Sequence, residues 1–176
     1  MILTGEEIKK EVKRGRICIS PFIEENVNPN SYNYRLGRTL FEIKKGSNLK
    51  KPLRYRKIKL TERGSILEPG KLYLGHTFER IGSDFYVTIL SGRSSVGRLG
   101  LYLQITADLG HVGSEHAWTL ELHAVQPLMV YPLMKIGQVS FWTMHGSKKL
   151  LYRGEYGRYS KPRTSKIYKE LNRKRP

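Results

Sequence analysis

The residues of this chain that could do chemistry gather in one segment, 91–101, which reads SGRSSVGRLGL. The segment holds two arginines, three serines and three glycines. Guanidinium groups bind phosphate through paired N–H donors, and glycines allow close approach of the backbone to an anion. One carboxylate, Glu121, follows within the apolar run 117–122. A phosphate-binding segment upstream of a strand-borne acid favours an enzyme that acts on nucleotides.

The elements that must position these residues are mostly strands. One short helix is predicted after Thr4, because Thr4 and Glu7 form a capping-box pattern and Gly15 is a suitable end. Many short strands separated by Gly and Pro turns indicate a mainly β sandwich or barrel. The predicted strands are 17–20, 32–36, 39–43, 58–60, 72–75, 85–90, 101–107, 117–122, 128–131 and 138–143.

Several blocks together resemble the dCTP deaminase family of the dUTPase superfamily. The blocks are SYNYRLG at 31–37, LEPG at 67–70, LGHT at 74–77, RSSVGRLGL at 93–101, TLEL at 119–122 and KIGQ at 135–138. Their order and spacing carry the resemblance, which runs nearly end to end. It implies a distorted jelly-roll or β-barrel of the dUTPase type with one short N-terminal helix. It also implies a homotrimer with sites between subunits.

The resemblance implies hydrolytic deamination of dCTP to dUTP and ammonia. Glu121 matches the family's catalytic glutamate, which takes a proton from water and passes it to the base. Ser94 and Arg98 match residues that orient the water and the base. By residue type alone, a plain carboxylate on the polar face of a strand is the better explanation of Glu121. The arginine motif upstream, at the family's spacing, favours the catalytic role.

Other positions match the family's substrate contacts. Arg93 and Ser95 match phosphate contacts, and the backbone carbonyl of Ala107 matches the group that holds the attacking water. Thr119 belongs to the matched TLEL block. By residue type, the arginine is also compatible with a surface or subunit salt bridge, and Ala107 with a small core residue.

Four more substrate contacts are implied nearer the C-terminus. Gln138 matches a glutamine of the family's bifunctional branch, and Tyr152 matches an aromatic side chain beside the nucleotide. Residues 157–168 resemble a shortened form of the segment that folds over the triphosphate in the family. There, Arg158 keeps the first basic position, and Lys161 replaces a missing polar contact. Mg²⁺ is expected only as a companion of the substrate triphosphate.

No metal is predicted to take part in the chemistry. Zinc deaminases of nucleobases carry a His-x-Glu motif and a Cys-x-x-Cys motif. Cys18 is the single cysteine of this chain, and its five histidines lack the usual zinc spacing. A lone cysteine forms no internal disulfide, so we also expect a reducing, cytoplasmic setting.

The largest departure from the family pattern is His111. An ungapped alignment places it where the family has an Asp that contacts the sugar and, in diphosphatase members, helps to activate water. Either Asp108 takes over through a loop rearrangement, or the role is lost. Three functions therefore stay open. They are dCTP deamination alone, a bifunctional deaminase and dUTP diphosphatase or dUTPase, and a weakly catalytic relative that binds nucleotides or nucleic acid.

The chain is strongly basic, with 32 Lys and Arg against 15 Asp and Glu. Residues 44–59 hold eight of the basic residues and no acid. Binding of a polyanion and an ordinary solvated surface both explain this, and we expect nucleic acid to bind weakly and nonspecifically at most. One domain is predicted over 1–168, followed by a basic tail at 169–176. We expect neither a signal peptide nor a membrane-spanning segment.

Overall fold

The computed structural model describes residues 1–147, 150–154, 156 and 159–173. Helix α1 (Gly5–Lys13) begins as predicted, since Thr4 is its N-cap and accepts a 3.3 Å hydrogen bond from the Glu7 backbone N–H. The helix ends at Arg14, and Gly15 follows with φ of 69°, a conformation that glycine adopts without steric cost. Ile8 is fully buried and packs α1 against the core.

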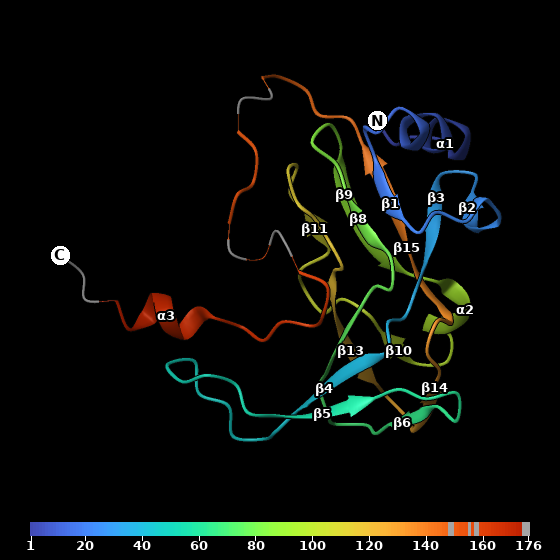
Figure 1. The fold of residues 1–176 in the computed structure, drawn as a ribbon. Coiled ribbons are helices and arrows are strands. Elements are labelled where there is room, and N and C mark those ends of the chain that lie inside the picture. The colour runs from blue at the N-terminus through green and yellow to red at the C-terminus, as the bar shows by residue number, and fades with distance from the viewer. Residues whose placement is uncertain (148–149, 155, 157–158, 174–176) are drawn as a thin grey trace.

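Two five-stranded sheets form the body of the molecule (Figure 1). The first has the order β10 (Leu101–Tyr102), β13 (Thr119–Ala124), β7 (Tyr73–His76), β4 (Thr39–Ile43) and β5 (Tyr55–Lys59). The second has the order β11 (Leu109–Gly110), β9 (Val87–Gly92), β15 (Lys135–Trp142), β3 (Ser31–Arg35) and β2 (Val27–Asn28). The strand pairs within both sheets are antiparallel, which confirms the predicted mainly β architecture.

Smaller elements complete the fold. One three-stranded sheet joins β1 (Cys18–Ser20), β8 (Arg80–Gly82) and β12 (Glu115–His116), and a two-stranded sheet joins β14 (Leu128–Val130) and β6 (Ser65–Leu67). The 3₁₀ turn η1 (Glu24–Asn26) precedes β2, the one-turn helix α2 (Ser94–Gly97) follows β9, and α3 (Ile167–Leu171) lies near the C-terminus. None of the helices in the described part of the chain is both long and apolar enough to span a bilayer.

The core lies between the strand layers and consists of aliphatic and aromatic side chains. Leu120 and Leu122 of β13 are fully buried, as are Tyr32 and Tyr34 of β3 and Phe141 of β15. Burial of one large apolar side chain contributes roughly 1.5–3 kcal/mol. Strand β13, which carries Glu121, is therefore held in register by the buried residues on its inner face.

The structure differs from the sequence-based expectation in several places. Strands β2, β6, β8, β11 and β12 and helix α3 were not predicted, and three further differences concern residues 94–107 and the C-terminal boundary. The strand expected at 101–107 stops at Tyr102, because the Ile105 N–H donates to the Glu121 side chain rather than to a neighbouring strand. Residues 94–97, for which no helix was predicted, form α2. The boundary expected after residue 168 falls inside α3, so the residues that follow it begin in a helix.

Candidate active site

Glu121 is positioned by the alternation of β13. Buried Leu120, Leu122 and Ala124 face the core, so Thr119, Glu121 and His123 project from the opposite face. Register places Glu121 opposite Leu74 of β7, and Leu74 opposite Phe41 of β4. The carboxylate is half-buried, and its Oε2 accepts a 3.0 Å hydrogen bond from the Ile105 backbone N–H. One carboxylate oxygen is thus held by the backbone.

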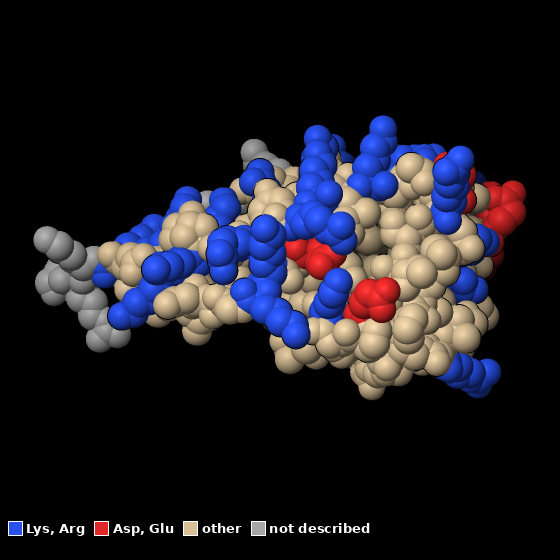
Figure 2. All heavy atoms as spheres, turned by 90° about the horizontal axis from the view of Figure 1, so that it is seen from below, with Lys and Arg blue, Asp and Glu red and all other residues tan. Residues whose placement is uncertain are grey.

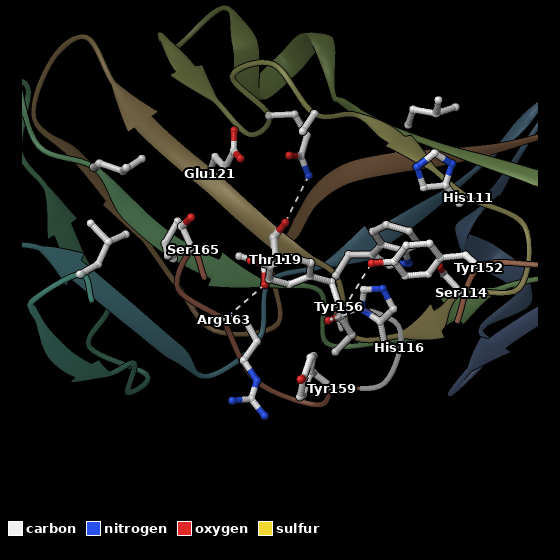
Figure 3. Close-up of a pocket in the computed structure, with 18 residues that line it drawn as sticks. His111, Ser114, His116, Thr119, Glu121, Tyr152, Tyr156, Tyr159, Arg163 and Ser165 are labelled. Atoms are coloured by element: carbon white, nitrogen blue, oxygen red, sulfur yellow. Dashed lines mark hydrogen bonds between the residues drawn. The ribbon is translucent and has the colours of Figure 1, made fainter. Parts of the chain in front are cut away.

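This face of β13 opens into a cavity of about 520 Å³. Figure 3 shows Glu121 on one side of the cavity, His111 and Tyr152 on the other, and Thr119 between them. Ala107 also lines it, so five of the predicted site residues share one cavity. Trp118, Tyr156 and Tyr159 add aromatic surface, which suits a flat heterocyclic base.

The C-terminal segment covers this cavity. The Ala117 N–H donates to the Tyr159 carbonyl at 2.8 Å, and the Arg163 N–H donates to Thr119 Oγ1 at 3.1 Å. The Arg163 guanidinium lies 3.6 Å from the centre of the Tyr159 ring. Sequence reasoning missed Tyr156, Tyr159, Arg163 and Ser165 as lining residues. Tyr159 follows Arg158, the basic position that matches the family, and this neighbour in the sequence could have indicated that the segment lines the cavity.

His111 lies in the Glu121 cavity, and Asp108 does not. The His111 ring stacks on Tyr152 with 5.5 Å between ring centroids, and the Tyr152 N–H donates to the Val112 carbonyl at 2.8 Å. Asp108 lines a neighbouring hollow between β9 and the 101–108 loop. The structure therefore places His111 in the cavity and Asp108 in the neighbouring hollow, so no rearrangement that brings Asp108 to the cavity is seen.

His116 also lines the cavity, and its side chain is buried. Burial lowers the pKa of His116, and its Nδ1 lies 3.0 Å from the Ala117 carbonyl oxygen. The lowered pKa keeps this imidazole neutral at pH 7, so it adds no positive charge beside the carboxylate.

The arginine motif lies outside this cavity within a single chain. Arg93 is the N-cap of α2 and donates from Nη1 to the Lys135 carbonyl at 3.0 Å, while Arg98 is the C-cap. Ser94 and Ser95 are exposed on α2. None of these four side chains lines the cavity that contains Glu121.

Two other predicted residues also lie apart. The Gln138 side chain donates to the Gly92 carbonyl at 3.3 Å and accepts from Ser31 Oγ at 3.1 Å, so it supports the start of the arginine motif. Lys161 lines a separate hollow beside Phe41. Arg158 lies outside the described residues.

Comparison with known proteins decides the family. The family model described as dCTP deaminase-like matches residues 2–144. The chain belongs to the dCTP deaminase-like family. A relative from Clostridium beijerinckii named "dCTP deaminase, dUMP-forming" is 42% identical over 174 residues, which cover 98% of this chain and 100% of the relative. A Leptospira biflexa relative of the same name is 41% identical over 175 residues, covering 99% of this chain and 100% of the relative.

The dCTP deaminase-like assignment agrees with a solved fold. The crystal structure of 2′-deoxycytidine 5′-triphosphate deaminase from Agrobacterium tumefaciens matches with a TM-score of 0.66 at 20% identity. The match covers 82% of this chain and 48% of the solved chain. The predicted dUTPase-type fold is therefore confirmed. As for metals, the described residues of this family member contain no group of three or more His, Cys, Asp or Glu placed to hold an ion.

Proposed function

We propose that this chain hydrolyses dCTP to dUMP, with release of ammonia and diphosphate. The observation that carries the proposal is Glu121, which projects into an aromatic-lined cavity from the strand position of the family's catalytic glutamate. Relatives that match over their whole length are named for formation of dUMP from dCTP. Those names favour dUMP over dUTP, the product expected from the sequence, and so favour the bifunctional alternative.

Two hydrolytic steps make up the reaction. In the first, Glu121 takes a proton from water, the oxygen attacks C4 of the base, and the C–N bond breaks as ammonia leaves with the relayed protons. The Ile105 N–H fixes one oxygen of Glu121, which leaves the other oxygen for the water. In the second, water attacks the α-phosphorus and the bond to diphosphate breaks. Mg²⁺ enters as part of the substrate, on its triphosphate.

His111 bears on the second step. It lies across the cavity from Glu121, where the family pattern has Asp. Neutral imidazole accepts a proton from water or a hydrogen bond from a sugar hydroxyl, so His111 is our candidate for the role of that Asp. Its replacement of a carboxylate is also the one observation that favours the alternative product, dUTP.

A homotrimer with shared sites completes the proposal. The arginine motif on α2 is solvent-accessible and does not reach the Glu121 cavity of its own chain. Exposed apolar side chains lie close to it in sequence, at Leu99, Tyr102 and Ile105. A neighbouring copy would cover this apolar surface and bring Ser94 and Arg98 to a second chain's Glu121. Cytoplasmic location stays a prediction.

One assay tests the function. Purified protein with Mg²⁺ is incubated with dCTP, CTP, dCMP or dUTP, and nucleotides, ammonia and diphosphate are quantified over time. We expect dCTP to yield equal amounts of ammonia, diphosphate and dUMP, and dUTP to yield dUMP. Accumulation of dUTP from dCTP would assign deamination alone. Binding without turnover of any of the four would support the weakly catalytic relative instead.

A further inference from the structure

A strongly basic face lies at the end of the molecule that carries β5 and α3. We call it the basic face and define it as residues 44–59 together with α3 and the residues after it up to Arg173. All eight Lys and Arg side chains of 44–59 are exposed, on the β4–β5 loop and on edge strand β5. Figure 2 shows Lys and Arg spread widely over the view from below, with few acidic side chains among them.

Two segments far apart in the sequence build this face together. The Asn172 side chain donates from Nδ2 to the Lys50 carbonyl at 2.9 Å, across 122 residues. This bond ties the end of α3 to the β4–β5 loop and brings Lys169 and Arg173 close to the lysines of the loop. The positive charges of the tail therefore add to those of the hairpin.

Most of the charge on 44–59 is uncompensated within the described residues. Arg56 pairs with Glu42, and the other seven Lys and Arg of this range form no ion pair there. Helix α1 is the opposite case, because Lys9, Lys10 and Arg14 each pair with a glutamate at 2.9–3.4 Å. Like charges gathered without partners raise the local positive potential and favour a polyanionic partner.

Two simpler explanations cover only part of the face. Lysine on an edge strand prevents edge-to-edge pairing, which accounts for Lys57 and Lys59 on β5 but not for lysines in the loop. Capture of the substrate triphosphate requires cations at the cavity. From 44–59 only Leu53 lines the Glu121 cavity, so the cations of this range lie outside it.

We propose that the basic face binds the phosphate backbone of nucleic acid without reading its sequence. Five residues of β5 span about 17 Å, and duplex DNA presents one charge per ~1.7 Å, so about ten phosphates lie along this length. Three cations lie on β5 itself and the other five of 44–59 lie on the loop before it, so the face can contact several of these phosphates. A membrane surface fits less well, because α3 has only five residues and the loop exposes one large apolar side chain, Leu49.

The test compares two variants that lose equal charge. The first is Lys50→Gln/Lys51→Gln/Lys57→Gln on the basic face, and the control is Lys9→Gln/Lys10→Gln/Lys13→Gln on α1. Binding of a fluorescein-labelled 20-base-pair duplex is followed by fluorescence anisotropy at about 50, 100 and 200 mM salt. Thermal unfolding verifies that both variants fold, and turnover of dCTP is measured in parallel.

We expect measurable duplex binding by the wild-type protein at low salt, with log K falling linearly as log salt rises. Each lost phosphate contact lowers the slope by about 0.9, so the face variant should lose about 2–3 in slope and at least tenfold in affinity. The α1 variant should change by less than threefold, and two unrelated duplex sequences should bind alike. Turnover of dCTP should stay unchanged in both variants.

Five results would overturn the proposal. Four concern binding: no duplex binding by the wild-type protein at about 50 mM salt, equal losses in the two variants, preference for one duplex sequence, and binding of anionic phosphatidylserine vesicles in place of the duplex. A rise in KM for dCTP in the face variant alone would also overturn it, because these lysines would then serve the substrate. The proposed enzymatic function is tested separately, by turnover of dCTP, so a failure of duplex binding does not contradict it.

Discussion

Replacement of Glu121 by glutamine separates the proton-transfer role of this side chain from its structural one. Glutamine is nearly the same size, and its carbonyl oxygen can keep the hydrogen bond from the Ile105 N–H. What it cannot do is take a proton from water. Loss of a general base typically lowers kcat by about 10²–10⁴, which corresponds to a barrier increase of about 3–5 kcal/mol.

The stability cost of Glu121→Gln should be small by comparison. The residue is half-buried and makes one backbone hydrogen bond. A hydrogen bond to a charged group contributes about 1.5–3 kcal/mol and a neutral one about 0.5–1.5, so the loss is on the order of 1 kcal/mol. For a domain of this size, that lowers Tm by about 2–4 °C. Loss of activity therefore cannot be attributed to unfolding.

The assay is ammonia release from dCTP, with nucleotide affinity measured by calorimetry. We expect kcat to fall at least 100-fold while the Kd for dCTP changes by less than about threefold. Hydrolysis of dUTP, which does not touch C4, should fall by less than tenfold. Glu115→Gln is the matched control, because Glu115 pairs with Arg80 and does not line the cavity. A Glu121→Gln variant that keeps more than a tenth of wild-type kcat would refute the assignment.

Three further predictions concern metal, assembly and pH. Dialysis against a strong zinc chelator, followed by return of Mg²⁺, should leave turnover unchanged; a loss that zinc alone restores would contradict the metal-free reaction. Light scattering at micromolar concentration should report a trimer, and a monomer with nucleotide bound would exclude shared sites. Burial raises the pKa of Glu11, but the Tyr86 hydroxyl, Arg14 and Arg16 outweigh it and lower the pKa below 4.5. The stabilisation is therefore complete above about pH 4.5 and lost as pH falls through the lowered value. Glu11→Gln should cost about 2 kcal/mol at pH 7 in urea unfolding and much less once the pH falls below the lowered pKa of Glu11; equal stability at pH 7 would argue against it.

Local patterns predicted most of the longer strands and the place of Glu121 on one of them. The alternation around Glu121 places it opposite the buried leucines, and the cap at Thr4 with the glycine at 15 bounds α1 as expected. Such features depend on neighbours in sequence. The strand prediction was wrong over 103–107 because the Ile105 N–H donates to the Glu121 side chain, 16 residues away, and neighbouring residues do not encode that contact.

Contacts between residues far apart in the sequence, at the site and at the basic face, could not be predicted from the sequence. Arg163 meets Thr119 across 44 residues and Asn172 meets Lys50 across 122, and no periodicity encodes either pairing. Ser94 and Arg98, which the family motif groups together, both lie on or next to α2, while their roles stay a prediction. Their separation from Glu121 within one chain appears only when both are placed in space.

The strict alternation of β13 makes catalysis a measure of correct strand pairing. A slip of one residue would turn Glu121 toward the core and leave Leu120 and Leu122 on the cavity side. In that register no carboxylate of β13 faces the cavity, so under the proposed mechanism we expect such a form to be inactive. During refolding, the recovered turnover should rise in step with protection of the Leu120 and Leu122 amides from hydrogen exchange. Specific activity then reports the fraction of molecules in the native register.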